Sequence, residues 1–382
     1  MGPLDGVRVV ELAHVAAGPF AGMLLADLGA DVVKVEPPTG DQMRGWPPFA
    51  DDGEERFSHN FASVNRNKRS VVADLKDPVD LSRAQALVAA ADVVVENYRP
   101  GVLDRLGLGY STVSEGHPGL VYCSISGYGL TSPYRDDGAY DVVIQGMSGL
   151  MSVTGEPDGN PVKAGVPVGD FTAGLYAAYT IAALLPQVRG TGRSVRVDCP
   201  MLDCLLGVSA LQTSEYWGSG REPQRLGTAH PRNAPYQGFS AADGDFTVAA
   251  GNDRLWAAVA EVVGRTELVG DPRFVTQVDR VRHQAELESL LQERFAGEKR
   301  EHWLTELRAR GVPCGPVNTF GEILADPHVE ATGLVAPVDV PVAGPTPTVV
   351  FPVRIEGQQP RLDRGAPRLG ADAAVYDEWV TT

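Results

Sequence analysis

The first 130 or so residues alternate short β-branched runs with helical patterns, and this alternation constrains the fold more than any other feature. The strand-like runs lie at 7–12, 31–36, 70–75, 92–98 and 120–126, and the helical patterns at 20–29 and 80–91. Continuous β-branched strands separated by helices are typical of a parallel sheet that is covered on both faces. We therefore expect a doubly wound, Rossmann-like α/β domain.

This large domain is predicted to occupy residues 1–220 in its first part, with a long helix after Asp170 and a further strand at 194–200. Segment 37–69 is rich in Gly, Pro and charged residues. A stretch of this composition and length is expected to lie over the surface as a long functional loop.

The pattern changes after Pro231. Two strand-like runs in 237–251 flank an Asp-Gly pair, which predicts a β-hairpin. Amphipathic helical patterns follow at 253–264, 280–295 and 300–311. We expect a smaller α+β domain over 225–325, and edge strands in the Pro- and Val-rich residues 326–382 that return to the large domain.

The charge balance bears on the class of partner. The chain of 382 residues carries a formal net charge of −16, which argues against nucleic acid, whose partners present a basic face. The basic side chains nevertheless cluster early, at Lys34, Arg44, Arg66, Lys68, Arg69, Lys76, Arg99 and Arg105. They could form a solvated, salt-bridged surface or a local site for an anion.

Several classes of site and location are not expected. The four cysteines lack metal-ligand spacing, and the seven histidines show no HxxxH or HExxH pattern, so we expect no metal site. We also expect no tightly bound cofactor. We expect no run long and apolar enough to span a membrane, and no leader pattern opens the chain, which predicts no membrane partner and a cytoplasmic location.

Asp170 stands directly after Gly169 at the start of an apolar helical run. An aspartate there could be an N-cap that accepts a hydrogen bond from the first turn of the helix. A carboxylate at such a position could also attack an electrophile as a nucleophile. Both interpretations stay open on these residues alone.

Two further stretches follow predicted strands, where ligands bind in a doubly wound sheet. The first turn, 13–20, lacks GxGxxG, which disfavours NAD and FAD, but its small residues would let a phosphate or an adenine approach the backbone. Asn97, Tyr98 and Arg105 could read a base edge, stack on adenine and bind a phosphate, or could form a capped loop with a surface arginine.

Blocks along nearly the whole chain, about residues 3–370, resemble the family III coenzyme A transferases. They include "PLDGVRVVELAHVAAGPFAGMLLADLGADVVKVEPPTGDQMRGW", "NRNKRSVVADLK", "ADVVVENYRPGVLDRLGLGY", "SISGYG", "AYDVVIQGMSGLM", "VGDFTAGLYAAYTIAALL" and "GVPCGPVNT", in the order of the family. The resemblance implies an enzyme that moves CoA from an acyl-CoA to a carboxylic acid. It further implies a homodimer of two interlocked rings.

The resemblance also implies site residues. Asp170 matches the nucleophile, which would pass through an aspartyl-CoA thioester. The CoA-binding positions fall on His14, Val15, Ala16, Ala17, Ala73, Leu75, Lys76, Asn97, Tyr98 and Arg105. Tyr128, Tyr140 and Asp141 match positions near the acyl group.

Departures from the family pattern limit the choice of substrate and reaction. Ala16 and Pro37 replace a glutamine and an arginine of formyl-CoA transferase, and 227–239 has no glycine-only lid, which argues against formate and oxalate. An acyl-CoA racemase or isomerase on the same fold is the alternative, but Tyr140 stands where racemases have a catalytic histidine. A non-catalytic CoA-binding protein is a third reading. The residues do not name the donor or the acceptor acid.

Overall fold

The computed structural model describes residues 2–358 and 361–380, which divide into two compact units. The first unit comprises Met1–Met151, Lys163–Arg221 and His328–Thr382, and the second Ser152–Val162 and Glu222–Pro327. Residues 152–162 therefore leave the large domain in which the sequence analysis placed them. The Gly227 N–H donates to the Gly155 carbonyl at 2.9 Å, which ties this segment to the second unit.

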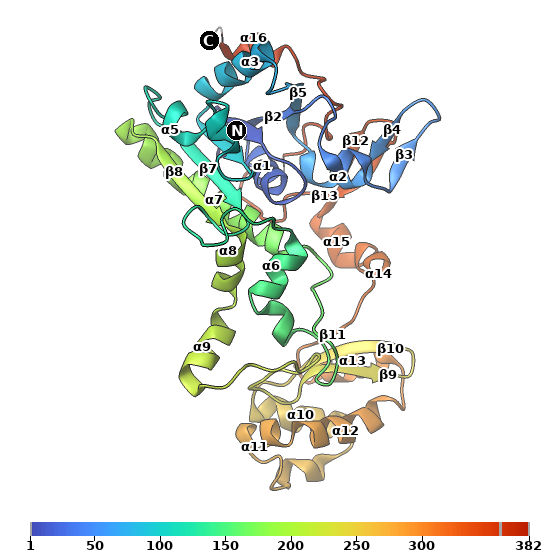
Figure 1. The fold of residues 1–382 in the computed structure, drawn as a ribbon. Helices are drawn as coiled ribbons and strands as arrows, with labels where there is room; N and C mark the ends of the chain where they lie inside the picture. Colours follow the sequence, from blue (N-terminus) through green and yellow to red (C-terminus); the bar gives the residue numbers. More distant parts are fainter. Residues whose placement is uncertain (1, 359–360, 381–382) are drawn as a thin grey trace. The chain divides into compact units, whose positions relative to one another are not determined.

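A six-stranded sheet with the order β5-β2-β1-β6-β7-β8 forms the centre of the first unit (Figure 1). Its strands are β1 (Arg8–Leu12), β2 (Asp31–Glu36), β5 (Lys68–Val72), β6 (Val93–Glu96), β7 (Val121–Ser126) and β8 (Val195–Pro200). All neighbouring strands pair in parallel. The predicted parallel sheet is confirmed, and its strand order is that of a doubly wound fold.

Alternate residues of these strands supply two separate cores, one on each face of the sheet. Val9, Val32 and Val93 belong to the core that contains residues of α1 (Ala17–Asp27) and α7 (Val168–Thr191). On the other face, core residues come from α3 (Pro78–Ala89) and α16 (Val375–Val380), which lie side by side in Figure 1. Both faces of β1, β2, β6 and β7 are buried, which explains their continuous β-branched runs, whereas the edge strand β8 leaves Arg196 and Asp198 exposed.

Helix α7 is, among the described residues, the one helix that is long and apolar enough to cross a membrane. The sequence analysis expected no run long and apolar enough to do so. Ala173, Ala177 and Ile181 are fully buried in the core against α1. Buried core helices can have the same length and composition as a membrane span, and these three residues place α7 in the core of the first unit.

Segment 37–69 is an ordered subdomain rather than the predicted surface loop. It contains η1 (Gln42–Gly45), β3 (Phe49–Asp51), β4 (Arg56–Ser58) and α2 (His59–Asn65). Phe57, Phe61 and Val64 pack in a separate buried cluster, which also includes Val338 and Val340 from much later in the chain. These aromatic and apolar residues, spread among charged ones, carry a core that periodicity did not reveal.

The remaining elements of the first unit lie between and after the strands of the sheet. They are α4 (Val102–Arg105), α5 (Tyr110–Val113), α6 (Asp141–Met147), α8 (Met201–Val208), α9 (Ala210–Ser219) and, towards the C-terminus, the two-stranded antiparallel β12 (Val335–Val340) and β13 (Gly344–Val349). The predicted edge strands thus pair with each other and do not extend the central sheet.

The second unit has a three-stranded antiparallel sheet with the order β11-β10-β9. Its elements are β9 (Tyr236–Ala241), β10 (Gly244–Ala249), α10 (Asp253–Val262), η3 (Thr266–Gly270), α11 (Gln277–Arg282), α12 (Gln284–Phe295), α13 (Arg300–Ala309), β11 (Cys314–Pro316) and α14 (Phe320–Leu324), with η2 (Leu150–Val153) and α15 (Pro327–Thr332) at its junctions with the first unit. The predicted hairpin is present, but the single helix predicted at 280–295 is divided at His283.

Candidate active site

Two predicted stretches meet where the strand order of the sheet reverses, between β1 and β6. The Asn97 side chain clamps the backbone of His14: its Oδ1 accepts the His14 N–H at 2.9 Å, and its Nδ2 donates to the His14 carbonyl at 2.8 Å. His14 Nε2 lies 3.1 Å from the Tyr98 hydroxyl. The switch point of a doubly wound sheet is where its ligands bind.

A cavity of about 330 Å³ opens at this point. Eight of the predicted site residues line it, namely His14, Val15, Ala16, Ala17, Asn97, Tyr98, Tyr140 and Asp170. They come from the ends of β1 and β6, from the residue before α6 and from the start of α7. The fold therefore brings the predicted nucleophile and the first-turn residues to one cleft.

A second cavity of about 350 Å³ contains Ala73, Leu75, Lys76 and Arg105, together with Pro37 and Tyr98. Its walls follow the ends of β2 and β5 and include α4. Tyr98 lines both cavities, so the two adjoin at this residue. Lys76 and Arg105 are exposed there, and their charges are available to an anion.

Asp170 is the third residue of α7, not its N-cap. The helix begins at Val168, its N-cap is Pro167, and no side chain caps it. The capping interpretation of Asp170 is therefore wrong, because the helix starts two residues earlier than the run of apolar residues suggested. Within the described part of the chain, its carboxylate takes part in no hydrogen bond or ion pair.

Burial, with a smaller effect from the nearby Asp141 carboxylate, raises the pKa of Asp170 to about 7. At neutral pH the group is therefore divided between its acid and its carboxylate form. A carboxylate that is poorly solvated and lacks a counter-ion is a better nucleophile than a solvated one.

Asp141 fixes the backbone next to Asp170 and does not line either cavity. Its Oδ1 accepts the Gly169 N–H at 2.8 Å, and its Oδ2 accepts a hydrogen bond from Gln145 Nε2 at 2.6 Å. Gln145 in turn accepts the Ala164 N–H at 2.8 Å. The loop that leads into α7 is thus held by α6, and Asp141 is placed to position the aspartate that follows Gly169.

Of the two predicted tyrosines, one faces the cleft and one does not. Tyr140 is exposed and lines the cavity beside Asp170. Tyr128 is buried in the core of the sheet, and its hydroxyl donates to Met147 Sδ at 3.4 Å. Tyr128 does not line either cavity.

The sequence analysis missed several residues of the first cavity. Arg99, Ser126, Arg135 and Met201 line it, and none of them was predicted to do so. Three follow or end a strand, and that position was the signal that could have found them. Arg135 comes from the loop after β7, whose course only the tertiary structure shows.

The basic cluster is divided between structural and available charges. Lys34 and Lys68 are fully buried, and Arg66 is nearly so. The solvated-surface interpretation is thus wrong for these three.

Among residues 2–358 and 361–380, no group of three His, Cys, Asp or Glu side chains could hold a metal ion.

Comparison with known proteins agrees with this geometry. The sequence model of CoA-transferase family III matches residues 4–373. The chain belongs to this family. A solved CaiB/BaiF family protein from Brucella suis has 43% identity and a TM-score of 0.90, with 99% of each chain covered. The family assignment inferred from the sequence blocks is therefore confirmed.

Curated relatives are also CoA-transferases. "Succinate--glutarate CoA-transferase" of Agrobacterium fabrum is 42% identical over 97% of this chain and 94% of its own length. "Succinyl-CoA:glutarate CoA-transferase" of Homo sapiens is 42% identical over 90% of this chain and 78% of its own. "Acetyl-CoA:oxalate CoA-transferase" of Acetobacter aceti is 37% identical over 98% and 94%.

Proposed function

We propose that this family III enzyme transfers CoA between an acyl-CoA and a carboxylic acid, with the Asp170 carboxylate as its covalent nucleophile. The observation that carries the proposal is the position of Asp170. Its carboxylate lines the same cavity as the first-turn residues, and burial raises its pKa to about 7. If Asp170 capped a helix or formed an ion pair, its carboxylate would be bound to those groups and would not be free to react.

The reaction divides into acyl transfers that balance without an added reagent. Asp170 attacks the thioester carbonyl and forms a C–O bond, the C–S bond breaks, and CoA leaves as a thiolate. The product on the enzyme is a mixed anhydride of the acyl group and Asp170. The thiolate then attacks the aspartyl carbonyl of the anhydride, which releases the donor acid and leaves an aspartyl-CoA thioester. The acceptor carboxylate takes the CoA by the reverse steps, and Asp170 is regenerated.

Asp141 is proposed to act through the backbone. By accepting the Gly169 N–H it fixes the start of α7, so the Asp170 carboxylate keeps one direction into the cleft. The N-terminal end of α7 carries a partial positive charge that would stabilise negative charge as it develops on the substrate. Only the ionised form of Asp170 attacks, so the rate of the first step should fall as the pH drops below about 7.

The two cavities suggest how CoA is seated. The thioester end of CoA would occupy the first cavity, beside Asp170, and the nucleotide end would occupy the second. Tyr98, which lines both cavities, would contact the part of the CoA molecule between these two ends. Lys76 and Arg105 would bind phosphate oxygens. CoA is a substrate in this proposal and is not a resident cofactor.

Replacing Arg105 with Ala should weaken CoA binding by about 1.5 to 3 kcal/mol, the range for a lost charge-assisted hydrogen bond. The fold should be unaffected because Arg105 is exposed. Calorimetric titration with CoA measures the change. Arg83→Ala is the matched control, since Arg83 is exposed on α3 and lines neither cavity. Equal affinities for both variants would make Arg105 an ordinary surface residue.

We infer dicarboxylic acids as the substrate class. The relatives from Agrobacterium fabrum and Homo sapiens are named for succinate or succinyl-CoA and glutarate. Arg135 lines the cavity that contains Asp170, and its guanidinium could bind the carboxylate that does not react. Exclusion of oxalate, which rests on the missing glycine lid, stays a prediction, because a relative named for oxalate is 37% identical.

A panel of acyl-CoAs and acids tests the function directly. Succinyl-CoA with glutarate should yield glutaryl-CoA and succinate, identified by mass spectrometry. Acetyl-CoA with monocarboxylic acids is the matched comparison. A chiral 2-methylacyl-CoA supplied without an acceptor acid tests the racemase alternative: loss of its optical purity, with no exchange in any pair of the panel, would favour that alternative.

We also propose the homodimer that the resemblance implies, in which two chains interlock as rings. Large apolar side chains are exposed on two helices of the first unit, at Leu175 and Tyr179 of α7 and at Leu211 and Trp217 of α9. Exposed apolar surface of this kind is typical of protein interfaces. Light scattering should give about twice the chain mass of 40.6 kDa. A stable monomer at micromolar concentration would contradict the proposal. The cytoplasmic location stays a prediction.

A further inference from the structure

Val15 adopts an unusual backbone conformation at the edge of the candidate active site. Its φ angle is 65°, in the left-handed region, although it is a β-branched residue. Such residues take this conformation only when the surrounding structure holds them in it. Val15 lines the cavity that contains Asp170, so the shape of the cleft depends on whatever holds this residue.

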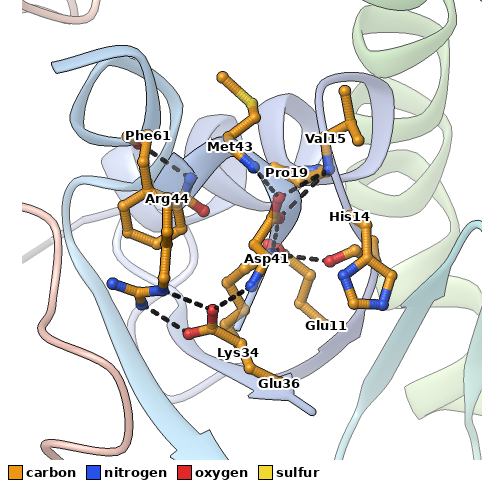
Figure 2. A network of polar contacts seen from close by, with 12 residues as sticks. Glu11, His14, Val15, Pro19, Lys34, Glu36, Asp41, Met43, Arg44 and Phe61 are labelled. Atoms are coloured by element: carbon orange, nitrogen blue, oxygen red, sulfur yellow. Dashed lines mark hydrogen bonds and ion pairs between the residues drawn. The ribbon is translucent and has the colours of Figure 1, made fainter. Parts of the chain in front are cut away.

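The buried carboxylate of Asp41 contacts the backbone of Val15 (Figure 2). Both carboxylate oxygens accept the Val15 N–H, each at 3.2 Å. Oδ1 also accepts the Met43 N–H at 2.9 Å. Asp41 thus joins the first turn to the η1 segment, while Asn97 clamps the backbone of the preceding residue, His14.

Asp41 is itself held by a buried network of charges. Lys34 Nζ lies 2.9 Å from Asp41 Oδ2 and 2.9 Å from Glu11 Oε1, and it donates to the Ala13 carbonyl at 2.7 Å. Lys68 Nζ lies 2.8 Å from Glu11 Oε2. The four side chains are buried, and their two positive and two negative charges balance, which satisfies the condition for charges in a core.

Neighbouring residues of the same segment also hold the backbone of Asp41 in place. Its N–H donates to Glu36 Oε2 at 3.0 Å, and Arg44 NH2 lies 2.7 Å from Glu36 Oε1. Burial opposes ionisation of Asp41, but Lys34 and the Met43 N–H hold the pKa of its carboxyl below the ordinary value. Asp41 therefore stays a carboxylate throughout the neutral pH range.

We propose that Asp41, anchored by Lys34, is a positioning residue that holds Val15 and the first turn in the shape required to bind the acyl-CoA. This inference rests on the proposed function, since it assigns the first turn to CoA. Neither Asp41 nor Lys34 lines the cavity that contains Asp170. The first turn lines that cavity, and the Asp41–Lys34 ion pair is buried behind the turn. Its effect should appear in CoA affinity rather than in the chemical step.

A double-mutant cycle isolates this role. Asp41→Asn keeps the shape of the side chain but loses the charge that Lys34 and the Val15 N–H meet. Glycine adopts positive φ angles freely, so in a Val15→Gly background the first turn should depend less on the hydrogen bond from residue 15 to Asp41. Asp41→Asn should raise the dissociation constant for CoA, and KM for succinyl-CoA, about tenfold in the unaltered background and about twofold or less in the Val15→Gly background. The value of kcat should change less than KM.

Asp27→Asn is the matched control. It breaks another buried ion pair of the same unit, to Arg66 at 2.6 Å, which does not contact the first turn. Its effect on CoA affinity should be small and equal in both backgrounds. Circular dichroism and a thermal melt show whether each variant is folded. An Asp41→Asn protein that folds only with Val15→Gly would support the proposal, because the strain at residue 15 would then be what Asp41 offsets.

The results that would overturn this inference differ from those that would overturn the proposed function. Equal effects of Asp41→Asn in both backgrounds, unchanged affinity of the folded variant, a failure to fold in both backgrounds, or an Asp27→Asn effect that depends on residue 15 would overturn the inference. In each case the unaltered protein still binds CoA. If the unaltered protein neither binds CoA nor transfers it, the proposed function fails, and the inference fails with it.

Discussion

Asp170→Asn should abolish CoA transfer, with kcat reduced by about four orders of magnitude, the scale seen when a covalent nucleophile is removed. An amide has the shape of the carboxylate but cannot form the anhydride. Steady-state assays with succinyl-CoA and glutarate measure the loss. Light scattering and circular dichroism should show that the variant keeps its fold and its oligomeric state.

Asp203→Asn is the matched control for this experiment. Asp203 lies in the first turn of α8, a comparable position on a neighbouring helix, but it is exposed and does not line the cavity. Its substitution should leave kcat within about twofold, as expected for a surface change. Full activity of Asp170→Asn would defeat the covalent mechanism and reopen the racemase and binding-protein alternatives.

Trapping identifies the intermediate directly. Acyl-CoA added without acceptor should load Asp170 as a thioester, which borohydride reduces to the alcohol, so the residue is recovered as homoserine. Peptide mass spectrometry locates the modified position. Homoserine at another aspartate, with Asp170 unmodified, would assign the nucleophile elsewhere.

Asp170→Asn should also stabilise the folded protein at alkaline pH. The folded pKa of Asp170, about 7, lies above its ordinary value of 3.8, so the folded chain binds this proton more tightly than the unfolded chain. The free energy of unfolding therefore falls as pH rises from about 4 to about 7, and the deficit is complete above 7. Full conversion of the shift gives about 4 kcal/mol, and contact of Asp170 with the cavity reduces our expectation to about 2 kcal/mol.

Urea unfolding at one fixed protein concentration tests this expectation at pH 8 and pH 4. Asp170→Asn should be more stable than the unaltered protein by about 2 kcal/mol at pH 8, with little difference at pH 4. Asp136→Asn, on the exposed loop beside the cleft, should follow the unaltered protein at both values. A gap that is constant with pH would show that Asp170 is not held in an unfavourable ionised state.

Local pattern was sufficient for much of the fold. The run Asp31–Glu36 is a strand of the length that its β-branched residues indicated, because each of its faces packs on a separate core. Strand ends also located His14 and Asn97 near each other, since parallel strands bring their carboxyl ends to one edge of the sheet. Asp170 reaches the same cavity from the start of α7. The family blocks supplied the chemical roles.

Other features depended on contacts that no local pattern contains. Periodicity placed the start of α7 too late, since Val168 and Gly169 carry no helical signal of their own. Tyr128 matched an acyl-site position by sequence, but it follows β7 into the core and packs there.

Short runs of residues and their order were enough to specify the parallel sheet, the family and the aspartate at the head of α7. Tertiary contacts, by contrast, bury Lys34 against a glutamate 23 residues earlier and against Asp41, and place Asp41 on the backbone of Val15. A lysine in a charged segment has the same appearance in sequence whether it is solvated or buried. Its role depends on whether the fold brings an opposite charge close enough to compensate for the water it loses.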